Sequence, residues 1–572
     1  MGIIFYNDAI NMSKIVIYQV LPRLFGNNTK EPVFNGSIKQ NGCGKFQSFT
    51  LGALRKIKEL GVTHIWYTGV IEHATQTDYR EFGIRRDHSA MVKGKAGSPY
   101  AIKDYYDVDP DLARNPAKRM GEFESLIERT HRLGLKIIID FVPNHVAREY
   151  HSDVKPNYVN DLGENDNTAQ AFCPNNNFYY IPGQPLACRF DMTGTDMTPY
   201  KEFPAKATGN DFFSPFPEIT DWYETVKLNY GVDYCGGCIK HFSPIPDTWK
   251  KMLDILFFWS EKHVDAFRCD MAEMVPLEFW HWAIPQIKNK YPNILFIGEV
   301  YNPSMYRDFI YKGNFDYLYD KVGLYDTLRA VIRMECGAQA ITSCWQQLDD
   351  IRNHMLYFLE NHDEQRLASP FFANDALKGI PALAVSVLMG TNPFMLYFGQ
   401  EFGEKGMDKE GFSGLDGRTT IFDYWKVTTI QKWRNNGKYN MSDVSPKSKS
   451  VYVMYKHILN LAQTESVFID GLFYDLMYVN CDNPNFDANR TFVFVRSTNT
   501  EACLVVCNFS DNETQAKINI PRHMLDFLKI TPKKYKARNL ITNEEQLITV
   551  SDNEQAKVAV SAWGVLLLKF SK

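Results

Sequence analysis

Two charged residues stand in a stretch that otherwise has the pattern of a buried strand. In VDAFRCD, residues 264–270, a single residue separates Arg268 from Asp270. Side chains alternate between the two faces of a strand, so Arg268 and Asp270 point one way while Phe267 and Cys269 point the other. Charged side chains are rarely buried unless they are paired. One face of this strand is therefore expected to pack on a core, and the other to face a site that needs charge.

Other strand-like runs also end in ionisable residues. KIIIDFVPNH (136–145) carries Asp140 and His145, ILFIGEV (294–300) carries Glu299, and MLYFLENHD (355–363) ends in His362 and Asp363. Like charges raise each other's pKa, so several acids around one Arg are costly as structure alone. They make sense if one acid keeps a proton to donate while Arg268 holds another ionised as a nucleophile. Retaining glycoside hydrolysis needs such a pair, about 5–5.5 Å apart.

These residues come together only if their strands run side by side in parallel. Strand-like runs alternate with segments of helical period at residues 15–25, 62–70, 136–145, 264–270, 294–300, 315–320, 355–363 and 394–401. This alternation predicts a parallel sheet, either open or closed into a barrel. Asp270 and Glu299 are spaced by about one βα unit of a barrel, roughly 30 residues. The interval from Asp140 to Asp270 holds one such unit and about 100 further residues.

The predicted fold class is therefore α/β, a (β/α)₈ TIM barrel with a domain inserted after strand 3 and a C-terminal all-β sandwich domain. We expect the barrel to cover residues 1–145 and 241–465, the inserted domain residues 146–240, and the sandwich residues 466–572. The last range is predicted from strand-like runs such as TFVFVRS and ACLVVCNFS, which replace the helical units there.

The composition argues against several classes of partner. The chain has 572 residues and a net charge of −4, which does not favour nucleic acid and offers no basic face to anionic lipid. Its first residues, MGIIFYNDAINMSKIV, lack the basic start and continuous apolar stretch of a secretory leader. The apolar run 379–399 is broken by Gly390, Asn392 and Pro393, so it predicts a helix, a turn and a strand instead of a membrane span. These features leave the oligomeric state open.

The cysteines favour a reducing compartment. There are 11 of them, an odd number scattered along the chain, which is typical of free thiols in a cytoplasmic protein. Four fall in or near the predicted insertion: Cys173, Cys188, Cys235 and Cys238. Because the last two form a CxxC pair, a zinc site or a disulfide is the alternative there.

Four segments then resemble, in order and on the expected strands, the characteristic segments of the α-amylase superfamily of glycoside hydrolases. They are DFVPNH (140–145), AFRCD (266–270), GEV (298–300) and ENHD (360–363). SPYAIKDYYDVDP (98–110) is similar to the family's segment after the second strand. Each motif alone is weak, but the ordered set is highly specific. The resemblance covers roughly residues 15–465, and the family's three-domain layout extends it to the whole chain.

The resemblance implies a retaining α-glucan hydrolase that cleaves α-1,4-glucosidic bonds of starch, glycogen or maltodextrins. Asp270 would be the nucleophile, Glu299 the general acid and base, and Asp363 the acid that binds hydroxyls beside the reacting carbon. The resemblance also assigns substrate-binding positions to four further residues: Tyr100, His145, Arg268 and His362.

This sequence departs from the family pattern at two places. Family members often carry a Lys-His pair after the fourth-strand segment, where this chain has Glu273 and Met274. This change bears on whether water or a sugar accepts the glycosyl unit. Asn144 matches the usual calcium ligand, but Lys227 stands where the family has a ligating Asp. An ammonium group could take the place of the cation there, so we expect that no cofactor is required, with calcium as the alternative.

Other interpretations remain beside the α-glucan hydrolase. An α-glucan transglycosylase would use the same residues and pass the glycosyl unit to a sugar. A metal-dependent barrel lyase would use acids on successive strands to bind Mg²⁺. A sugar-binding relative without catalysis would usually have lost an acid. Individually, Arg268 and Asp270 could be a structural ion pair, and His145 and Tyr100 could be core residues.

Overall fold

The computed structural model describes residues 14–572. The start of the chain, where no secretory leader was predicted, lies largely in residues 1–13 and so outside the described residues. No helix between residues 14 and 572 combines the length and the apolar character needed to cross a membrane.

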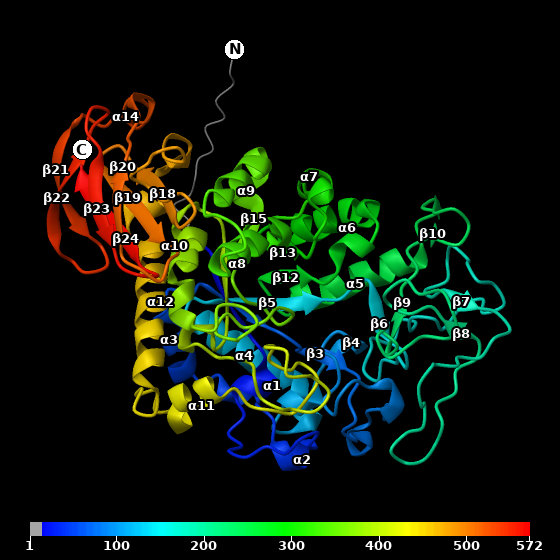
Figure 1. Cartoon of the computed structure of the whole chain (residues 1–572). Coiled ribbons are helices and arrows are strands. Elements are labelled where there is room, and N and C mark those ends of the chain that lie inside the picture. The colour runs from blue at the N-terminus through cyan, green and yellow to red at the C-terminus, as the bar shows by residue number, and fades with distance from the viewer. Residues whose placement is uncertain (1–13) are drawn as a thin grey trace.

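Eight parallel strands close into a barrel in the order of the chain, which confirms the predicted fold class (Figure 1). They are β1 (Val16–Val20), β2 (His64–Tyr67), β5 (Lys136–Phe141), β12 (Ala266–Cys269), β13 (Leu295–Gly298), β14 (Tyr317–Tyr319), β15 (Met355–Phe358) and β16 (Phe394–Tyr397). β1 pairs with both β2 and β16, which closes the cylinder. The strands are rich in Val, Ile, Phe and Tyr because parallel strands are buried on both faces.

Helices surround the cylinder (Figure 1). The longer ones are α3 (Leu51–Lys58), α4 (Arg119–Arg132), α5 (Asp247–Glu261), α6 (Leu277–Lys290), α9 (Ala340–Leu348), α10 (Ile380–Leu388) and α12 (Pro446–Thr464), and the shorter ones include α1 (Pro22–Phe25), α2 (Ile38–Asn41), α7 (Tyr306–Tyr311), α8 (Asp326–Ile332), α11 (Thr428–Arg434) and α13 (Ser466–Ile469). The apolar run 379–399 forms α10 and then β16, as the turn residues between them predict.

Two excursions leave the barrel on the side of the strands' carboxyl ends. After β2, strands β3 (Ile71–His73) and β4 (Ile102–Val108) form an antiparallel hairpin that the sequence did not predict. After β5, a long irregular segment is held by three short ladders, β6–β9, β7–β8 and β10–β11. Their bounds are β6 (His145–Ala147), β7 (Tyr180–Ile181), β8 (Ala205–Lys206), β9 (Thr225–Lys227), β10 (Val232–Asp233) and β11 (Ile239–Lys240).

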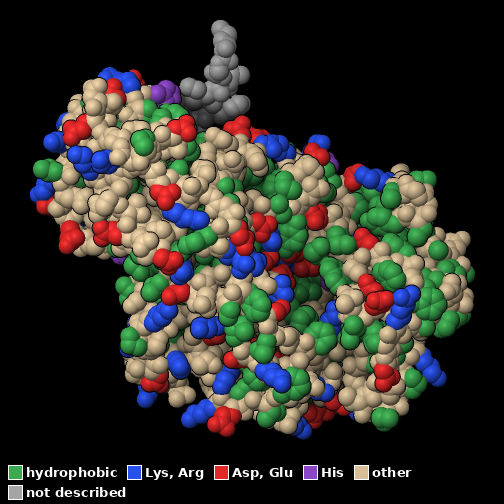
Figure 2. Space-filling view, viewed as in Figure 1, with side chains coloured by type: hydrophobic (Ala, Val, Ile, Leu, Met, Phe, Trp, Pro, Cys, Tyr) green, Lys and Arg blue, Asp and Glu red, His purple; other side chains and the backbone are tan. Residues whose placement is uncertain are grey.

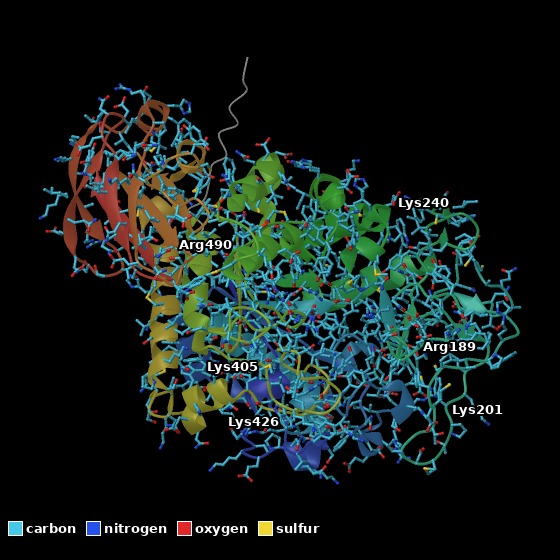
Figure 3. All side chains as sticks on the ribbon, viewed as in Figure 1. Arg189, Lys201, Lys240, Lys405, Lys426 and Arg490 are labelled. Carbon is cyan, nitrogen blue, oxygen red and sulfur yellow. The ribbon has the colours of Figure 1, made fainter. Side chains whose placement is uncertain are left out.

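The irregular segment carries basic residues at its outer edge. Figure 3 shows Arg189, Lys201 and Lys240 at the rim of the molecule, away from the barrel. Arg189 pairs with Glu218 at 2.8 Å and Lys240 with Glu278 at 2.6 Å, and all four side chains are exposed. Exposed pairs of this kind contribute little to stability, so these charges belong to a solvated face.

The C-terminal part is an all-β domain with one short helix, α14 (Arg522–Leu528) (Figure 1). One sheet has the order β17-β18-β19-β24-β21-β22, and the other consists of β20 and β23. The bounds are β17 (Leu472–Asp475), β18 (Thr491–Ser497), β19 (Glu501–Asn508), β20 (Thr514–Ile518), β21 (Lys533–Asn539), β22 (Glu545–Val550), β23 (Ala556–Val560) and β24 (Val565–Ser571). Helix α10 is buried at every position and contacts β15 of the barrel as well as β19 and β24 of this domain.

A glycine fixes the path of the loop that carries Tyr100. Gly97 has φ +78°, and a Cβ atom there would overlap the backbone carbonyl oxygen of Ala74. Gly83 has a similar φ of +82° but no atom within 4 Å of the same position. The two glycines therefore share the backbone conformation and differ in the space around them.

We expect Gly97→Ala to destabilise the protein by about 3 kcal/mol or more, because a left-handed conformation and a backbone clash add together. Gly83→Ala is the matched control and should cost about 1 kcal/mol, for the conformation alone. Thermal unfolding of the two variants and the parent measures the difference. Equal losses in the two variants would contradict the close contact at Gly97.

Candidate active site

The guanidinium of Arg268 lies among three carboxyl groups from three adjacent strands. Its Nη1 is 2.6 Å from Asp270 Oδ1 and 3.6 Å from Asp140 Oδ1, and its Nη2 is 2.7 Å from Glu299 Oε1. The contact with Glu299 is an ion pair without the alignment of a hydrogen bond. The Arg268 side chain is 1% exposed. Because the two terminal nitrogens of a guanidinium are about 2.3 Å apart, Asp270 Oδ1 and Glu299 Oε1 lie within about 8 Å of each other.

Strand register brings these groups together. In the barrel, Arg268 on β12 stands beside Asp140 on β5, and Cys269 stands beside Gly298 on β13. Asp270 and Glu299 follow immediately, and the Glu299 N–H donates to the Cys269 carbonyl at 3.1 Å. The carboxyl ends of parallel strands meet at one mouth of a barrel, so both acids emerge there.

One positive charge faces more acid than it can neutralise. Burial raises the pKa of Asp140 to about 6, while Arg268 opposes this rise. Burial also raises the pKa of Asp270 well above its usual range, with Arg268 again opposing and Glu299 adding to the rise. Burial and Glu299 raise the pKa of Asp363 to about 7, although 45% of its side chain faces open space. Burial and mutual repulsion therefore favour protonation of Asp140, Asp270 and Asp363 compared with solvated acids, and the charge of Arg268 opposes this effect.

Glu299 has further partners that the sequence did not identify. Its Oε1 accepts a hydrogen bond from the Tyr301 hydroxyl at 2.6 Å, and its Oε2 accepts one from the Met271 N–H at 2.8 Å. Met271 has φ +43°, a left-handed conformation that is uncommon for a non-glycine residue and is often found at functional sites. Glu273 Oε2 accepts from the N–H groups of Tyr301 and Asn302, each at 3.0 Å. Glu273 thus ties the loop after β12 to the loop after β13.

His362 links Tyr100 to Asp363. The Gln19 amide donates to His362 Nδ1 at 2.8 Å, so the ring proton lies on Nε2, which is 2.6 Å from Tyr100 Oη and 3.1 Å from Asp363 Oδ2. The Tyr100 and His362 rings stack with centroids 5.1 Å apart. Burial and the charge of Arg268 lower the pKa of His362 well below its usual value, so its imidazole is neutral.

The predicted catalytic and substrate-binding residues, except Arg268, border a single cavity of about 330 Å³. Its walls are formed by Lys93, Ser98, Tyr100, His145, Trp222, Glu224, Thr225, Asp270, Met271, Glu299, Tyr301, His362, Asp363, Ile421 and Phe422. Arg268 lies behind Asp270 and Glu299 and contacts both. Figure 2 shows a hollow on this face of the molecule with acidic side chains inside it. Pairs of buried acids in a concave site are a pattern of functional sites.

No sequence motif marks Lys93, Trp222, Glu224 or Tyr301, which border the cavity and lie in loops. The position of Tyr301, two residues after Glu299, was the one local signal. His145 borders the cavity with its ring centroid 5.2 Å from that of Trp222, and burial lowers the pKa of His145 to about 3.

The position beside Asn144 does not fit a calcium ion. The Lys227 ammonium contacts Asn144 Oδ1 and lies 2.7 Å from Asp211 Oδ1 and 3.2 Å from the Met274 carbonyl oxygen. These oxygens are the kind that calcium prefers, but here they surround a buried Lys side chain that is 2% exposed. A divalent cation could bind to these oxygens only if the ammonium group moved away, because the two positive charges repel each other.

Two further sets of side chains, one of carboxyl groups and one of thiols, are of types that can bind metal ions. Glu72, Asp104 and Asp107 lie close together and are buried. However, Asp107 pairs with Arg119, and Asp104 accepts hydrogen bonds from Ser152 and nearby backbone N–H groups. Burial and Asp104 raise the pKa of Glu72 well above its usual range, and the Lys103 ammonium lies 4.0 Å from Glu72 Oε1. Cys173, Cys188, Cys235 and Cys238 are free thiols and form no metal-ligand cluster among residues 14–572.

Comparisons with known proteins agree with this fold. Residues 19–450 match the family model "Alpha amylase, catalytic domain", and residues 478–571 match "Alpha amylase, C-terminal all-beta domain". Alpha-amylase 3 of Dictyoglomus thermophilum is 24% identical over 382 residues, 63% of this chain and 66% of that protein. Cyclomaltodextrin glucanotransferase of Geobacillus stearothermophilus is 22% identical over 421 residues, 69% of this chain and 50% of that protein. The matches thus span less than two thirds of these relatives' own length.

A solved structure extends the likeness to the whole chain. A maltogenic α-amylase from Thermotoga neapolitana aligns with a TM-score of 0.61 and 19% identity, covering 98% of this chain and all of that one. At this level of identity, the similarity shows the fold alone.

We expect the melting temperature to stay within about 1 °C on addition of EDTA or calcium, because a ligand stabilises a protein only if the folded state binds it. As a positive control, Lys227→Ala frees the oxygens of Asn144 and Asp211, so calcium should raise the melting temperature of that variant. Differential scanning calorimetry with and without each additive measures both effects. A large fall for the parent with EDTA, reversed by calcium, would contradict the assignment of Lys227.

Proposed function

Because the chain belongs to the α-amylase family, we propose that it is a retaining α-glucan hydrolase that cleaves α-1,4-glucosidic bonds of starch, glycogen or maltodextrins. One observation carries the proposal: Asp270 and Glu299 contact the same guanidinium at the edge of one cavity. This arrangement supplies two carboxyl groups on adjacent strands, no more than about 8 Å apart and therefore within reach of one glycosidic bond.

In the first step, Asp270 attacks C1 of the sugar while Glu299 gives its proton to the glycosidic oxygen. The C1–O bond breaks, the shortened glucan leaves as an alcohol, and an ester joins C1 to Asp270. In the second step, Glu299 takes a proton from water as that water attacks C1. The ester bond breaks, Asp270 is released as a carboxylate, and Glu299 is again an acid.

The remaining site residues hold the sugar in our proposal. Neutral His362 donates through Nε2, and Asp363, partly open to the cavity, accepts from hydroxyl groups beside the reacting carbon. Arg268 orients Asp270 and offsets part of the negative charge. Tyr100 gives a flat apolar surface that is already stacked on His362, and His145 borders the same space.

An α-glucan transglycosylase is the second candidate. It is supported by the apolar walls that Trp222, Tyr301 and Phe422 give to the cavity, which suit a sugar acceptor. The similarity to a cyclomaltodextrin glucanotransferase is consistent with it. A metal-dependent lyase is less well supported, because the acids here surround a guanidinium. We also propose a cytoplasmic location, supported by the eleven free thiols.

Digestion of maltoheptaose tests the proposal. We expect products shorter than the substrate that are released with the α configuration, as followed by chromatography and proton NMR. Products longer than maltoheptaose would favour the transglycosylase.

Asp270→Asn should lower kcat by at least about 1,000-fold, because the nucleophile is lost. Asp265→Asn is the control at the opposite end of β12, where Asp265 pairs with His131 and Lys136, and it should keep kcat nearly unchanged. Unchanged turnover in Asp270→Asn would refute the assignment.

Arg268→Lys should lower kcat on maltoheptaose by about 100-fold or more, because a compact ammonium cannot contact Asp270 and Glu299 as a planar fork does. Arg366→Lys is the matched control: Arg366 is also fully buried and pairs with Glu360 at 2.9 Å, but its polar contacts are with Glu360, Thr419 and Phe398 instead of the two acids. It should reduce the melting temperature while leaving kcat within a few-fold. Equal loss of kcat in both variants would mean that Arg268 acts through stability alone.

A further inference from the structure

One part of the cavity wall is built from two segments that are far apart in the sequence. Lys93 comes from the loop between β3 and β4, and Trp222 and Glu224 come from the irregular segment immediately before β9. Ile421 and Phe422 also border the cavity. None of these residues contacts Asp270 or Glu299 through a hydrogen bond or ion pair in the part of the chain that the structure describes.

Lys93 and Glu224 form a nearly buried ion pair on this wall. Lys93 Nζ is 2.9 Å from Glu224 Oε1, and the side chains are 11% and 5% exposed. Removing two charges from water is costly, and a fold that needed only packing could place apolar residues here. A charged pair on the wall of a cavity therefore suggests a polar ligand.

Glu224 also has unused capacity for hydrogen bonds. Its Oε2 is buried and accepts no hydrogen bond from residues 14–572. A buried acceptor without a donor costs free energy, and most such atoms in proteins have a partner. A hydroxyl group from a ligand in the cavity could supply the missing donor, while the ammonium of Lys93 could donate to a second oxygen.

The surroundings of the pair suit a neutral sugar ring. Lys93 and Glu224 together carry no net charge, so they do not select an anionic or a cationic polymer. Trp222, whose indole borders the same cavity, offers a flat apolar face. Its ring lies 5.2 Å from that of His145, which joins this wall to the wall that holds Tyr100 and the acids.

We propose that Lys93 and Glu224 bind hydroxyl groups of a glucose unit next to the one held at Asp270, and so favour oligosaccharides over shorter substrates. This inference rests on the proposed function, and it names a part of the site that the resemblance to the family did not assign.

Calorimetric titration of maltoheptaose into the Asp270→Asn protein tests the inference without turnover. Adding Glu224→Gln should weaken binding by about 10- to 100-fold, the range for loss of hydrogen bonds to a charged group. Glu202→Gln in the same background is the matched control, because Glu202 forms a similar buried pair with Arg148 at 2.7 Å but does not border the cavity. It should leave the affinity unchanged.

A double variant separates sugar binding from a structural role. The double variant Lys93→Met with Glu224→Gln removes both charges together. If the ion pair is purely structural, replacing both partners often restores what replacing one partner loses. If the pair binds sugar, the double variant binds maltoheptaose as weakly as the Glu224→Gln variant does. Recovery of parental affinity in the double variant, or unchanged affinity in Glu224→Gln, would overturn the inference. Failure of the unaltered protein to cleave maltoheptaose would instead refute the proposed function, and the inference with it.

Discussion

A single buried guanidinium organises the mouth of the barrel. Arg268 is shared by Asp270 and Glu299, with Asp140 nearby, and without its charge these carboxyl groups would repel one another in a poorly solvated space. Register between β5, β12 and β13 keeps the acids together, because separating them would break hydrogen bonds of the barrel itself. The closed sheet thus keeps these carboxyl groups close together despite their repulsion. On flexible loops, the same groups would move apart. The same guanidinium opposes the rise in pKa that burial imposes on Asp140 and Asp270.

Much of this arrangement could be predicted from the sequence. The barrel strands are runs of apolar and β-branched residues, as strands buried on both faces require, and their ionisable ends point to one mouth. The segment 98–110 was harder to predict, because β4 mixes charged residues with two adjacent tyrosines and pairs with a strand about thirty residues earlier in the chain, roughly the length of one βα unit. Lys227 was recognised as a departure from the family pattern, and its ammonium lies against Asn144.

The second wall of the cavity could not be predicted for a physical reason. Lys93, Trp222 and Glu224 come from loops. Loops lack the periodic pattern of apolar residues that, in a helix or a strand, indicates which side chains face the interior. These residues come together only through the way the loop between β3 and β4 packs against the segment after β5. Glu273 shows the limit of motif reasoning in another way. The sequence shows that Glu273 departs from the family pattern. Only the structure shows that it accepts hydrogen bonds from two backbone N–H groups and so supports the loop that carries Tyr301.

Helix α10 has no face turned to water, since the barrel covers one side and the C-terminal sheet another. Arg496 of β18 reinforces this junction by donating to the carbonyl of Leu388 at the end of α10, at 3.1 Å. If either neighbour were removed, water would reach a helix that is apolar except for Ser386, and its exposed surface would promote aggregation. The C-terminal sheet is thus part of the hydrophobic interior that the barrel needs, and heat should unfold the two as one cooperative unit.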